Sequence, residues 1–314
     1  MVVRSRAPVR IDFAGGWTDV AVFADSVGGA VVSATIDKYV HGHMRTMDGG
    51  QRPADPAPDA PGAWEWQVPG EGITVAYHSD LPAGSGLGTS ATLNVVWLSL
   101  VRARPVNEAD RATLAELAYD LERILGILGG RQDQYASAFG GVNYLTFGGT
   151  TGVERLRLDP RVIAELEDRL VLCYTGRPRL SSTIHHDVWE SYRSGSPTTV
   201  QALYGLRQVA AEVRIALLNG DLERFGALLN QNWEYQQALH ASVSNAQIER
   251  VFEHAVRRGA VAGKACGAGG GGCLLFLSAA GGKAELEGAL AELGVRVIPF
   301  RFEFEGLTVE VDPA

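Results

Sequence analysis

The sequence predicts an α+β fold with room for one large or two medium domains. Strand-like and helix-like segments follow one another without the regular strand–helix alternation of a doubly wound sheet, which favours an α+β architecture. The chain has 314 residues, of which 46% are hydrophobic and 20% charged, so it can bury a substantial core. The sequence contains no internal repeat.

The first part of the chain is predicted to be mostly strand. Residues 6–16, RAPVRIDFAGG, alternate and then break on glycines, as a strand that enters a turn does. Residues 30–47 are rich in Val, Ile, Thr and Tyr, and residues 64–68 and 73–79 alternate again. Residues 48–63 are rich in Pro, Ala, Asp and Gly, and we expect an exposed loop there.

Two helices and a strand are expected next. From Ser90 onward, apolar residues recur at helical spacing, and residues 114–128 repeat that pattern. Residues 129–135, GGRQDQY, indicate a break in regular structure. Residues 141–147, GVNYLTF, predict a strand.

The second half of the chain mixes strands with longer helices. The expected strands are residues 169–176, 295–306 and 307–311, and the expected helices are residues 198–239, 248–260 and 283–293. The longest helical segment is interrupted at residues 219–221, Asn-Gly-Asp, where Asp221 is suited to cap the helix that follows.

Composition disfavours several classes of partner. The formal net charge of −8 disfavours nucleic acid and anionic membrane surfaces. Cys173, Cys266 and Cys273 lack the spacing of metal ligands, so we expect small buried thiols and a reducing compartment. The N-terminus has no apolar signal region, and no run of 18 apolar residues occurs. These observations predict a cytoplasmic protein without a nucleic-acid or membrane partner.

Residues 81–92, LPAGSGLGTSAT, place a glycine-rich loop between a strand and a helix. Unpaired N–H groups and the dipole at a helix N-terminus attract anions, and glycines let phosphate oxygens approach closely. The loop is not a Walker-type P-loop, because no lysine follows Gly88, and its G-x-G-x-G spacing does not match the dinucleotide-binding fingerprint. A phosphate loop of another kind remains, or a tight turn capped by Thr89 or Ser90.

A second glycine cluster, Gly267 and residues 269–272, lies between Lys264 and an apolar strand. This number of glycines exceeds what packing alone is expected to require. Two glycine loops in one chain therefore predict a polyphosphate ligand that is held from two sides.

Three segments, in this order, resemble the GHMP small-molecule kinases, the superfamily of galactokinase, homoserine kinase, mevalonate kinase and phosphomevalonate kinase. The first is residues 6–11, RAPVRI, together with residues 15–19, GGWTD. The second is the glycine loop, in which Thr89 replaces the family's first serine. The third is residues 264–273, KACGAGGGGC.

The resemblance implies a ribosomal-protein-like N-terminal domain at residues 1–165 and a ferredoxin-like C-terminal domain at residues 166–314. It also implies that ATP and Mg²⁺ bind between the two domains. The residues that would contact the ATP phosphates are Gly84, Ser85, Gly86, Leu87, Gly88, Thr89 and Ser90.

The resemblance also assigns metal and catalytic roles. Ser90 and Glu122 match the family's serine and glutamate that bind Mg²⁺, and such hard oxygen ligands suit this ion. Asp133 matches the catalytic aspartate, which accepts the hydroxyl proton or orients the hydroxyl. Arg10 lies where relatives keep a lysine or arginine near that aspartate, and such a cation also stabilises transferred phosphate.

Further residues are implied to contact the substrate. Asp19 resembles the aspartate with which galactokinase-like members hold sugar hydroxyls, and Trp17 either stacks on a pyranose face or is a core residue. The other predicted substrate contacts are Gly16, Arg177, Arg179, Gly269 and Gly270. Arg177 and Arg179 form either a clamp for a substrate phosphate or an exposed basic loop.

The segments RIDFAGGWTD and QDQYASAFGG resemble the branch of fucokinases and heptose-phosphate kinases, which phosphorylate an anomeric sugar hydroxyl. We therefore predict an ATP-dependent kinase for the anomeric hydroxyl of a heptose 7-phosphate or a related sugar. Trp17 is more fucokinase-like, so an unphosphorylated fucose, galactose or uronic acid, or a cyclitol, stays open. A non-catalytic sugar sensor is the other class of protein considered, which the matching site residues disfavour.

The protein is expected to be a monomer or a homodimer. His185 and His186 are expected to be a surface pair.

Overall fold

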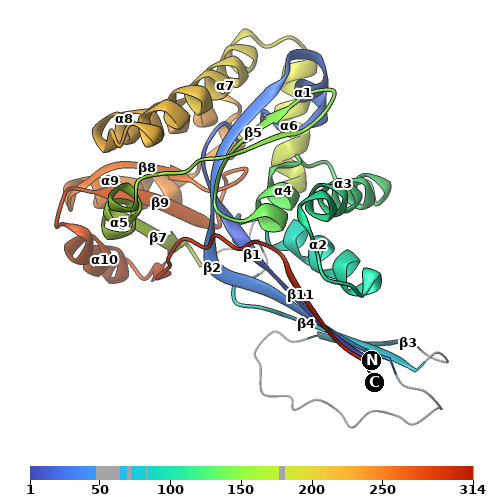
Figure 1. The fold of residues 1–314 in the computed structure, drawn as a ribbon. Helices are drawn as coiled ribbons and strands as arrows, with labels where there is room; N and C mark the ends of the chain where they lie inside the picture. The colour runs from blue at the N-terminus through green and yellow to red at the C-terminus, as the bar shows by residue number, and fades with distance from the viewer. Residues whose placement is uncertain (47–63, 69–71, 83, 177–180, 314) are drawn as a thin grey trace.

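The computed structural model describes residues 1–46, 64–68, 72–82, 84–176 and 181–313. Its described part consists of two antiparallel sheets covered by helices, which confirms the expected α+β class. The two termini lie beside each other at one end of the molecule (Figure 1). The loop expected at residues 48–63 and the residues Arg177 and Arg179 lie outside the described part.

The first sheet is built around two long, neighbouring strands. Its described strands are β1 (Val2–Ala14), β2 (Gly29–Thr46), β3 (Trp64–Val68), β4 (Ile73–Ser79), β5 (Val142–Phe147), β6 (Gly152–Arg155) and β11 (Thr308–Asp312). The main order is β11-β1-β2-β4-β3, with β5 on β2 and β6 on β5. Strand β2 changes partner along its length, because residues 29–34 pair with β5 and residues 40–46 pair with β4.

The second sheet is smaller and more deeply buried. Its described strands are β7 (Leu170–Tyr174), β8 (Ala260–Ala265), β9 (Cys273–Ser278) and β10 (Arg296–Val297), in the order β10-β7-β9-β8. All of these pairs are antiparallel. Every residue of β9 is buried, which explains its unbroken apolar sequence. This four-stranded sheet agrees with the ferredoxin-like domain that the resemblance implies.

The helices occupy separate faces of the two sheets. They are α1 (Ala21–Val27), α2 (Thr89–Arg102), α3 (Glu108–Ile124), α4 (Gln132–Phe139), α5 (Pro160–Arg169), α6 (Ser181–Arg193), α7 (Pro197–Leu218), α8 (Leu222–Ala238), the short 3₁₀ helix η1 (Ala241–Val243), α9 (Ala246–Arg257) and α10 (Lys283–Glu292). Helices α2, α3 and α4 pack together, and α2 and α4 contact β1 and β2. Helices α7 and α8 form a hairpin that contacts β1 and also reaches β8 in the second sheet (Figure 1).

Side-chain caps explain where several helices begin. The expected interruption at residues 219–221 is confirmed, since Asp221 accepts a hydrogen bond from the Arg224 N–H at 2.9 Å and begins α8. Asn107 and Asp110 form a reciprocal capping box at the start of α3. These caps satisfy donors that the first turn of a helix leaves unpaired.

Helices α1, α5 and α6 were not predicted, and two further expectations were wrong. Residues 129–135 do not only break regular structure, because α4 begins within them. Residues 295–306 form a strand only at β10, since the chain then crosses from the second sheet to the first, where Phe302 bridges Ile36. Helix α5 had a local sequence feature, an Asp159 cap followed by Pro160 in the first turn.

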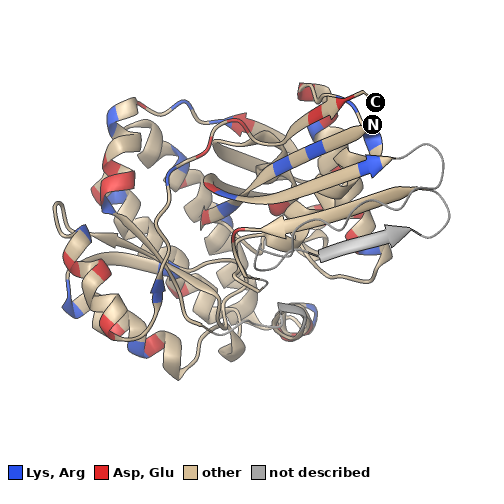
Figure 2. Cartoon of the chain, turned by 90° about the horizontal axis from the view of Figure 1, so that it is seen from below, with Lys and Arg blue, Asp and Glu red and all other residues tan. Residues whose placement is uncertain are grey.

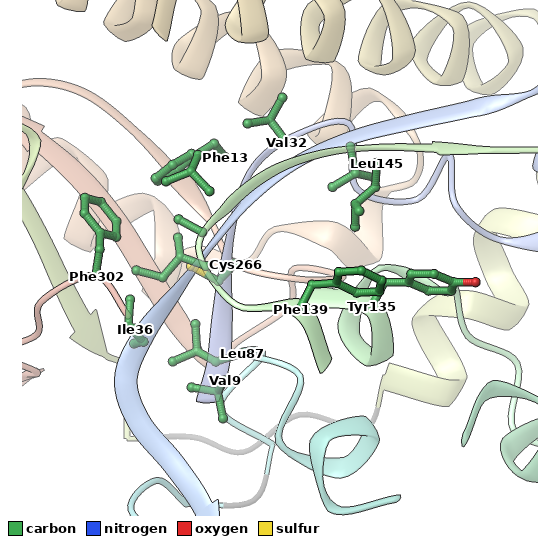
Figure 3. Packing of buried hydrophobic residues seen from close by; sticks show 14 of the residues in the cluster. Val9, Phe13, Val32, Ile36, Leu87, Tyr135, Phe139, Leu145, Cys266 and Phe302 are labelled. Atoms are coloured by element: carbon green, nitrogen blue, oxygen red, sulfur yellow. The ribbon is translucent and has the colours of Figure 1, made fainter. Parts of the chain in front are cut away.

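One hydrophobic core joins the two sheets. Figure 3 shows Phe13 and Ile36 from the first sheet, Phe139 from α4 and Cys266, the residue after β8, in the same cluster. A second cluster packs α9 and α10 against the second sheet and also includes residues of α6, which contacts α7. The expectation of buried cysteines is confirmed for all three thiols. The predicted domain boundary falls within α5, and β11 returns from the C-terminal half to pair with β1.

The outer surface carries both signs of charge. Figure 2 shows acidic and basic positions next to one another on the outer helices. Among the described residues, no helix is long and apolar enough to cross a membrane.

Candidate active site

A cavity of about 1240 Å³ brings together residues from the three segments singled out in the sequence. Arg10, Trp17 and Asp19 come from the first segment, and Gly267 and Ala268 come from the third. The residues that line it from the glycine loop, α3 and α4 are Gly84, Ser85, Gly86, Gly88, Thr89, Ser90, Glu122, Gln132 and Asp133. The volume exceeds that of an ordinary single-ligand pocket, so there is space for a nucleotide and a second small molecule.

The glycine loop has the backbone of an anion cradle. Gly84, Gly86 and Gly88 have φ values of +76°, +82° and +78°. Every second residue of this loop is therefore left-handed, a conformation that favours glycine. Gly88 directly precedes the first turn of α2, whose unpaired N–H groups border the cavity. A Cβ on Gly88 would lie only 3.0 Å from Cγ of Asp133, so the loop also needs glycine to pass α4.

The second glycine cluster supports the first. The Cys273 N–H donates to the Ser85 carbonyl at 2.7 Å, and a Cβ on Gly272 would lie 2.6 Å from that same oxygen. Close packing also explains Gly269 and Gly270, where an added Cβ would meet Val243 O at 2.5 Å and Ile184 Cδ1 at 2.4 Å. Packing therefore accounts for Gly269, Gly270 and Gly272, which is more of the cluster than expected. Gly269 and Gly270 pack against neighbouring chain, while Gly267 and Ala268 line the cavity.

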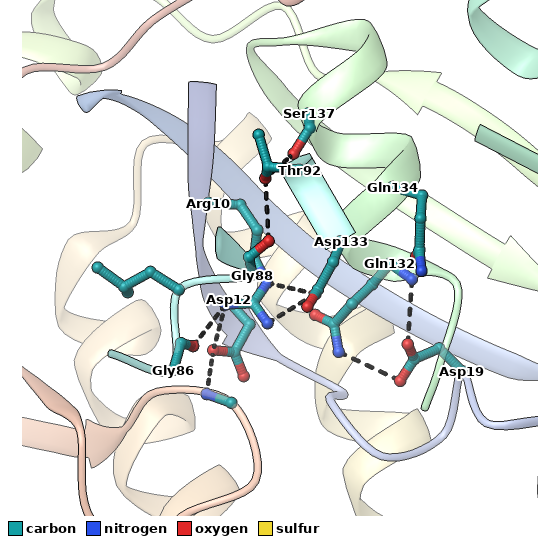
Figure 4. A network of polar contacts seen from close by, with 12 residues as sticks. Arg10, Asp12, Asp19, Gly86, Gly88, Thr92, Gln132, Asp133, Gln134 and Ser137 are labelled. Carbon is teal, nitrogen blue, oxygen red and sulfur yellow. Dashed lines mark hydrogen bonds and ion pairs between the residues drawn. The ribbon is translucent and has the colours of Figure 1, made fainter. Parts of the chain in front are cut away.

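Arg10 and Asp133 form a charged pair in the wall of the cavity (Figure 4). Nε of Arg10 lies 2.8 Å and Nη2 lies 2.6 Å from Oδ1 of Asp133, and Nη1 donates to the Gly86 carbonyl at 2.8 Å. The pair therefore joins β1, the glycine loop and the first turn of α4. Burial opposes the charge of Arg10, but Asp133 and Asp12 outweigh it and hold its pKa above the ordinary value.

Asp19 holds the start of α4 in place. Its two carboxylate oxygens accept hydrogen bonds from the backbone N–H of Gln132 at 3.1 Å and from the Gln132 side-chain amide at 3.2 Å (Figure 4). Gly130 passes so close that a Cβ there would lie 1.7 Å from Oδ2 of Asp19. Burial raises the pKa of Asp19 to about 6, although the bond from Gln132 works in the opposite direction.

Glu122 and Ser90 offer oxygen donors to the same cavity. Asn94 donates to Oε1 of Glu122 at 3.1 Å, and Gln134 donates to Oε2 at 2.8 Å. Burial, with a further contribution from Asp133, raises the pKa of Glu122 to about 7. No cationic side chain of the described part pairs with this buried carboxylate. A carboxylate and a hydroxyl that lack a cation fit the ligand preference of Mg²⁺.

Trp17 and His185 form another wall of the cavity. Trp17 is 4% exposed, has a φ of +82°, and packs against the His185 ring, with centroids 4.5 Å apart and the ring planes tilted by 35°. Trp189 donates from its indole N–H to Nδ1 of His185 at 3.3 Å. The histidines are therefore not a surface pair, because His185 lines the cavity and only the His186 side chain, 75% exposed, faces outward. Trp17 belongs to the core and to the cavity wall at once.

Sequence reasoning missed several residues that hold the site together. Asp12 accepts hydrogen bonds from Lys264 and from the Gly267 backbone, and Gln132 and Gln134 orient Asp19 and Glu122. Asp12 had a detectable signal, because residues two apart on a strand share a face and Asp12 follows Arg10 by two. Gly16 lies against Asp12, where a Cβ would come within 2.9 Å of Oδ2.

Loop amides at a helix N-terminus, an Arg–Asp pair and the side-chain oxygens of Ser90 and Glu122 face one cavity. This arrangement defines a phosphotransferase. Two family models match the chain, "GHMP kinases N terminal domain" at residues 61–141 and "GHMP kinases C terminal" at residues 213–294. A D-glycero-alpha-D-manno-heptose 7-phosphate kinase from Campylobacter jejuni is 31% identical over 97% of this chain and 98% of its own length. The chain belongs to the GHMP kinase family, as a phosphotransferase with an alcohol group as acceptor.

Two further relatives agree with this assignment. An L-fucokinase/L-fucose-1-P guanylyltransferase from Bacteroides fragilis is 28% identical over 88% of this chain and 34% of its own length. The crystal structure of a D-glycero-D-manno-heptose 1-phosphate kinase from Bacteroides thetaiotaomicron superposes with a TM-score of 0.74 at 28% identity. That match covers 99% of this chain and 100% of the other. The expected two-domain GHMP kinase fold is thereby confirmed.

Proposed function

We propose that this chain transfers the γ-phosphoryl group of ATP to the anomeric hydroxyl of a sugar, with a heptose 7-phosphate as the leading substrate. The observation that carries the proposal is the contact of Arg10 with Asp133 at 2.6 and 2.8 Å, beside the glycine loop and within one cavity. The choice of a heptose phosphate rests on the 31% identical relative from Campylobacter jejuni.

The proposed chemistry assigns one task to each group. Asp133 orients the anomeric hydroxyl and takes its proton as the new O–P bond forms and the bond from the γ-phosphorus to the β,γ-bridging oxygen breaks. ADP leaves with the bridging oxygen. Arg10, anchored on both Asp133 and Gly86, stabilises negative charge on the transferred group. Backbone N–H groups of the loop and of the first turn of α2 bind the phosphates.

The proposed cation ligands are Ser90 and Glu122. Bound Mg²⁺ would offset the negative charge of the phosphates. Glu122 supports this role because it is 6% exposed and accepts two hydrogen bonds that fix its carboxylate. The ion would also supply the positive charge that this buried carboxylate lacks among the described side chains.

The proposed sugar contacts line the same cavity as Asp133. Asp19 and Trp17 line the cavity together with Gln132, which supports a sugar site at this end. His185 joins them from α6. That Arg177 and Arg179 bind a phosphate at the other end of the sugar stays a prediction. An unphosphorylated fucose, galactose or uronic acid, or a cyclitol, is the alternative substrate. The proposed location is the cytoplasm, where ATP is abundant.

A coupled ADP-release screen tests the proposed substrate class. The panel is heptose 7-phosphate, heptose 1-phosphate, fucose, galactose, glucuronate, N-acetylhexosamines and cyclitols, and phosphorus NMR locates the new phosphate. We expect heptose 7-phosphate to give the highest kcat/KM and an anomeric phosphate as product. Preference for an unphosphorylated sugar would overturn the substrate assignment but keep the kinase. Tight binding of sugar and ATP without turnover would identify a sensor instead.

Substitutions at Asp133 and Glu122 test the assigned roles. Asp133→Asn removes the proton acceptor and Glu122→Ala removes a cation ligand, so each is expected to lower kcat by about 10²–10⁴-fold in a folded protein. Asp120→Asn, on the exposed face of α3, is the matched control and should retain turnover. Near-normal sugar-dependent ADP release from either site variant would contradict its role, and near-ultraviolet circular dichroism checks that each variant is folded.

A further inference from the structure

A fully buried ion pair lies directly behind the catalytic residues. Nζ of Lys264 is 2.7 Å from Oδ2 of Asp12 and also donates to the Asp12 carbonyl at 2.8 Å. The two side chains are 0% and 1% exposed. Oδ1 of Asp12 accepts a hydrogen bond from the Gly267 N–H at 2.9 Å. One carboxylate on β1 thus holds both β8 and the part of the second glycine cluster that lines the cavity.

The same carboxylate is the second anionic neighbour of Arg10. Nη1 of Arg10 lies 3.8 Å from Oδ1 of Asp12, while Oδ1 of Asp133 lies 2.6 Å from Nη2 (Figure 4). Charges therefore alternate in the order Lys264, Asp12, Arg10, Asp133, from a fully buried pair to the wall of the cavity. Burial opposes ionisation of Asp12, but Lys264 and then Arg10 hold its pKa below the ordinary value.

A buried ion pair contributes little net stability, because removing two charges from water costs about as much as their attraction returns. Stability alone therefore gives a weak reason for Lys264 and Asp12 to occupy this place. The contacts of the two residues indicate another reason. Lys264 fixes the Asp12 carboxylate, whose Oδ1 faces Nη1 of Arg10, while Asp133 takes Nε and Nη2 of the same guanidinium.

We propose that the Asp12–Lys264 pair is a positioning device, in which Lys264 fixes the Asp12 carboxylate beside Nη1 of Arg10 so that Arg10 stays on Asp133 and the glycine loop. The pair contacts neither substrate nor ATP and acts through Arg10 and Gly267. The inference rests on the proposed roles of Arg10 and Asp133. It also explains why the site needs both halves of the chain, since Asp12 lies on the first sheet and Lys264 on the second.

The test compares single and paired substitutions. Asp12→Asn leaves the Lys264 charge buried without a partner and is expected to unfold readily. The double variant D12N/K264M removes both charges, and the amide oxygen introduced at position 12 remains an acceptor for the Gly267 N–H. We expect its Tm to lie within about 5 °C of the wild type. We expect its kcat to fall about 10- to 100-fold, because Arg10 is displaced, with both KM values changed by less than about threefold.

A second readout does not depend on knowing the sugar. The Nε–H of Arg10 donates to Asp133 in the wild type, and its ¹H–¹⁵N resonance, identified by its absence in Arg10→Lys, reports that contact. We expect exchange of this proton with water to be at least about tenfold faster in D12N/K264M. If the wild type phosphorylates no sugar, the proposed function fails, whereas this resonance still decides the positioning role.

The matched control is Asp110→Asn, which removes another buried carboxylate, paired with Arg102, away from the cavity. It should lower Tm while kcat and the Arg10 resonance stay unchanged. A double variant with wild-type kcat and wild-type exchange would overturn the proposal and leave an ordinary structural ion pair. Should D12N/K264M not fold, D12N/K264Q, which keeps a hydrogen-bonding group at position 264, provides the same comparison with the same deciding outcomes.

Discussion

At the scale of single residues, Asp19 is a buried carboxylate whose charged form lowers the stability of the native state. The carboxylate is 1% exposed and accepts hydrogen bonds from the backbone and the side-chain amide of Gln132. Its pKa of about 6 lies above the ordinary value of 3.8, because burial disfavours the charged form. The native state therefore binds a proton more readily than the unfolded chain does.

The sign of the pH dependence follows from this difference. Between about pH 4 and pH 6 the native protein is protonated at Asp19 and the unfolded chain is not, so stability falls as the pH rises through this window. Above it the full penalty is present, and below it the penalty disappears.

Asp19→Asn is thus expected to stabilise the protein at pH 8, by about 1–3 kcal/mol in the free energy of unfolding. The Gln132 amide can turn to accept a hydrogen bond from the introduced amide group, since the Gln132 side-chain oxygen is buried without a hydrogen-bond partner. Urea denaturation at pH 8, 6 and 4.5 measures the effect, and the gain should shrink as the pH falls. A variant that is less stable than the wild type by the same amount at every pH would contradict this account.

At the scale of elements, the glycine loop and α4 are fitted to each other. Gly88 adopts a left-handed conformation immediately before α2, and its missing side chain leaves room for Asp133 in the first turn of α4. Arg10 connects the same two elements through Gly86 and Asp133. A change in the loop is therefore expected to displace the Asp133 carboxylate as well as the loop itself.

Gly88→Ala tests this coupling. The substitution adds left-handed strain and places a methyl group 3.0 Å from Asp133 Cγ. We expect a loss of about 1–2 kcal/mol in stability and at least about a tenfold fall in kcat. Gly294→Ala is the control, because Gly294 has a φ of +75° and an added Cβ there meets nothing within 4 Å. Steady-state kinetics and denaturation of both variants test the coupling. Equal kcat values for the two variants would show that backbone strain alone, and not the contact with Asp133, lowers activity.

At the scale of the whole molecule, the two halves of the chain depend on each other. The core cluster contains Phe13 from β1, Phe225 from α8 and Leu275 from β9. Strand β11 pairs with β1 across nearly the full length of the sequence, as in Val2 with Asp312. Helices α7 and α8 contact both sheets. The first sheet therefore completes its packing only with residues from the C-terminal half.

A fragment of residues 1–165 is accordingly expected not to fold on its own. It lacks β11, α7 and α8, so apolar side chains on β1 and β2 would face water. Urea unfolding and a ¹H–¹⁵N spectrum test this, with the full chain as the reference that should unfold in a single cooperative step. A sharp transition and dispersed amide signals from the fragment would instead establish an independent domain.

Local chemistry made part of this site predictable. The glycine loop could be recognised because positive φ angles and close phosphate approach require glycine at defined positions, and Gly84, Gly86 and Gly88 have such angles. The Asp221 cap was predictable for the same reason, since its partner is only three residues away. Helix α4 was not predictable, because Asp19 binds its first turn across 113 positions of sequence.

The sequence by itself determined the α+β class, the glycine loop and the residue types of a GHMP kinase site, because these depend on local periodicity and on motif residues. Only the tertiary structure decided which residues meet. It placed Lys264 on Asp12 across 252 positions, packed the second glycine cluster beneath the first loop, and brought His185 to Trp17. Such contacts arise when two sheets share one core, and no short stretch of the chain contains both partners.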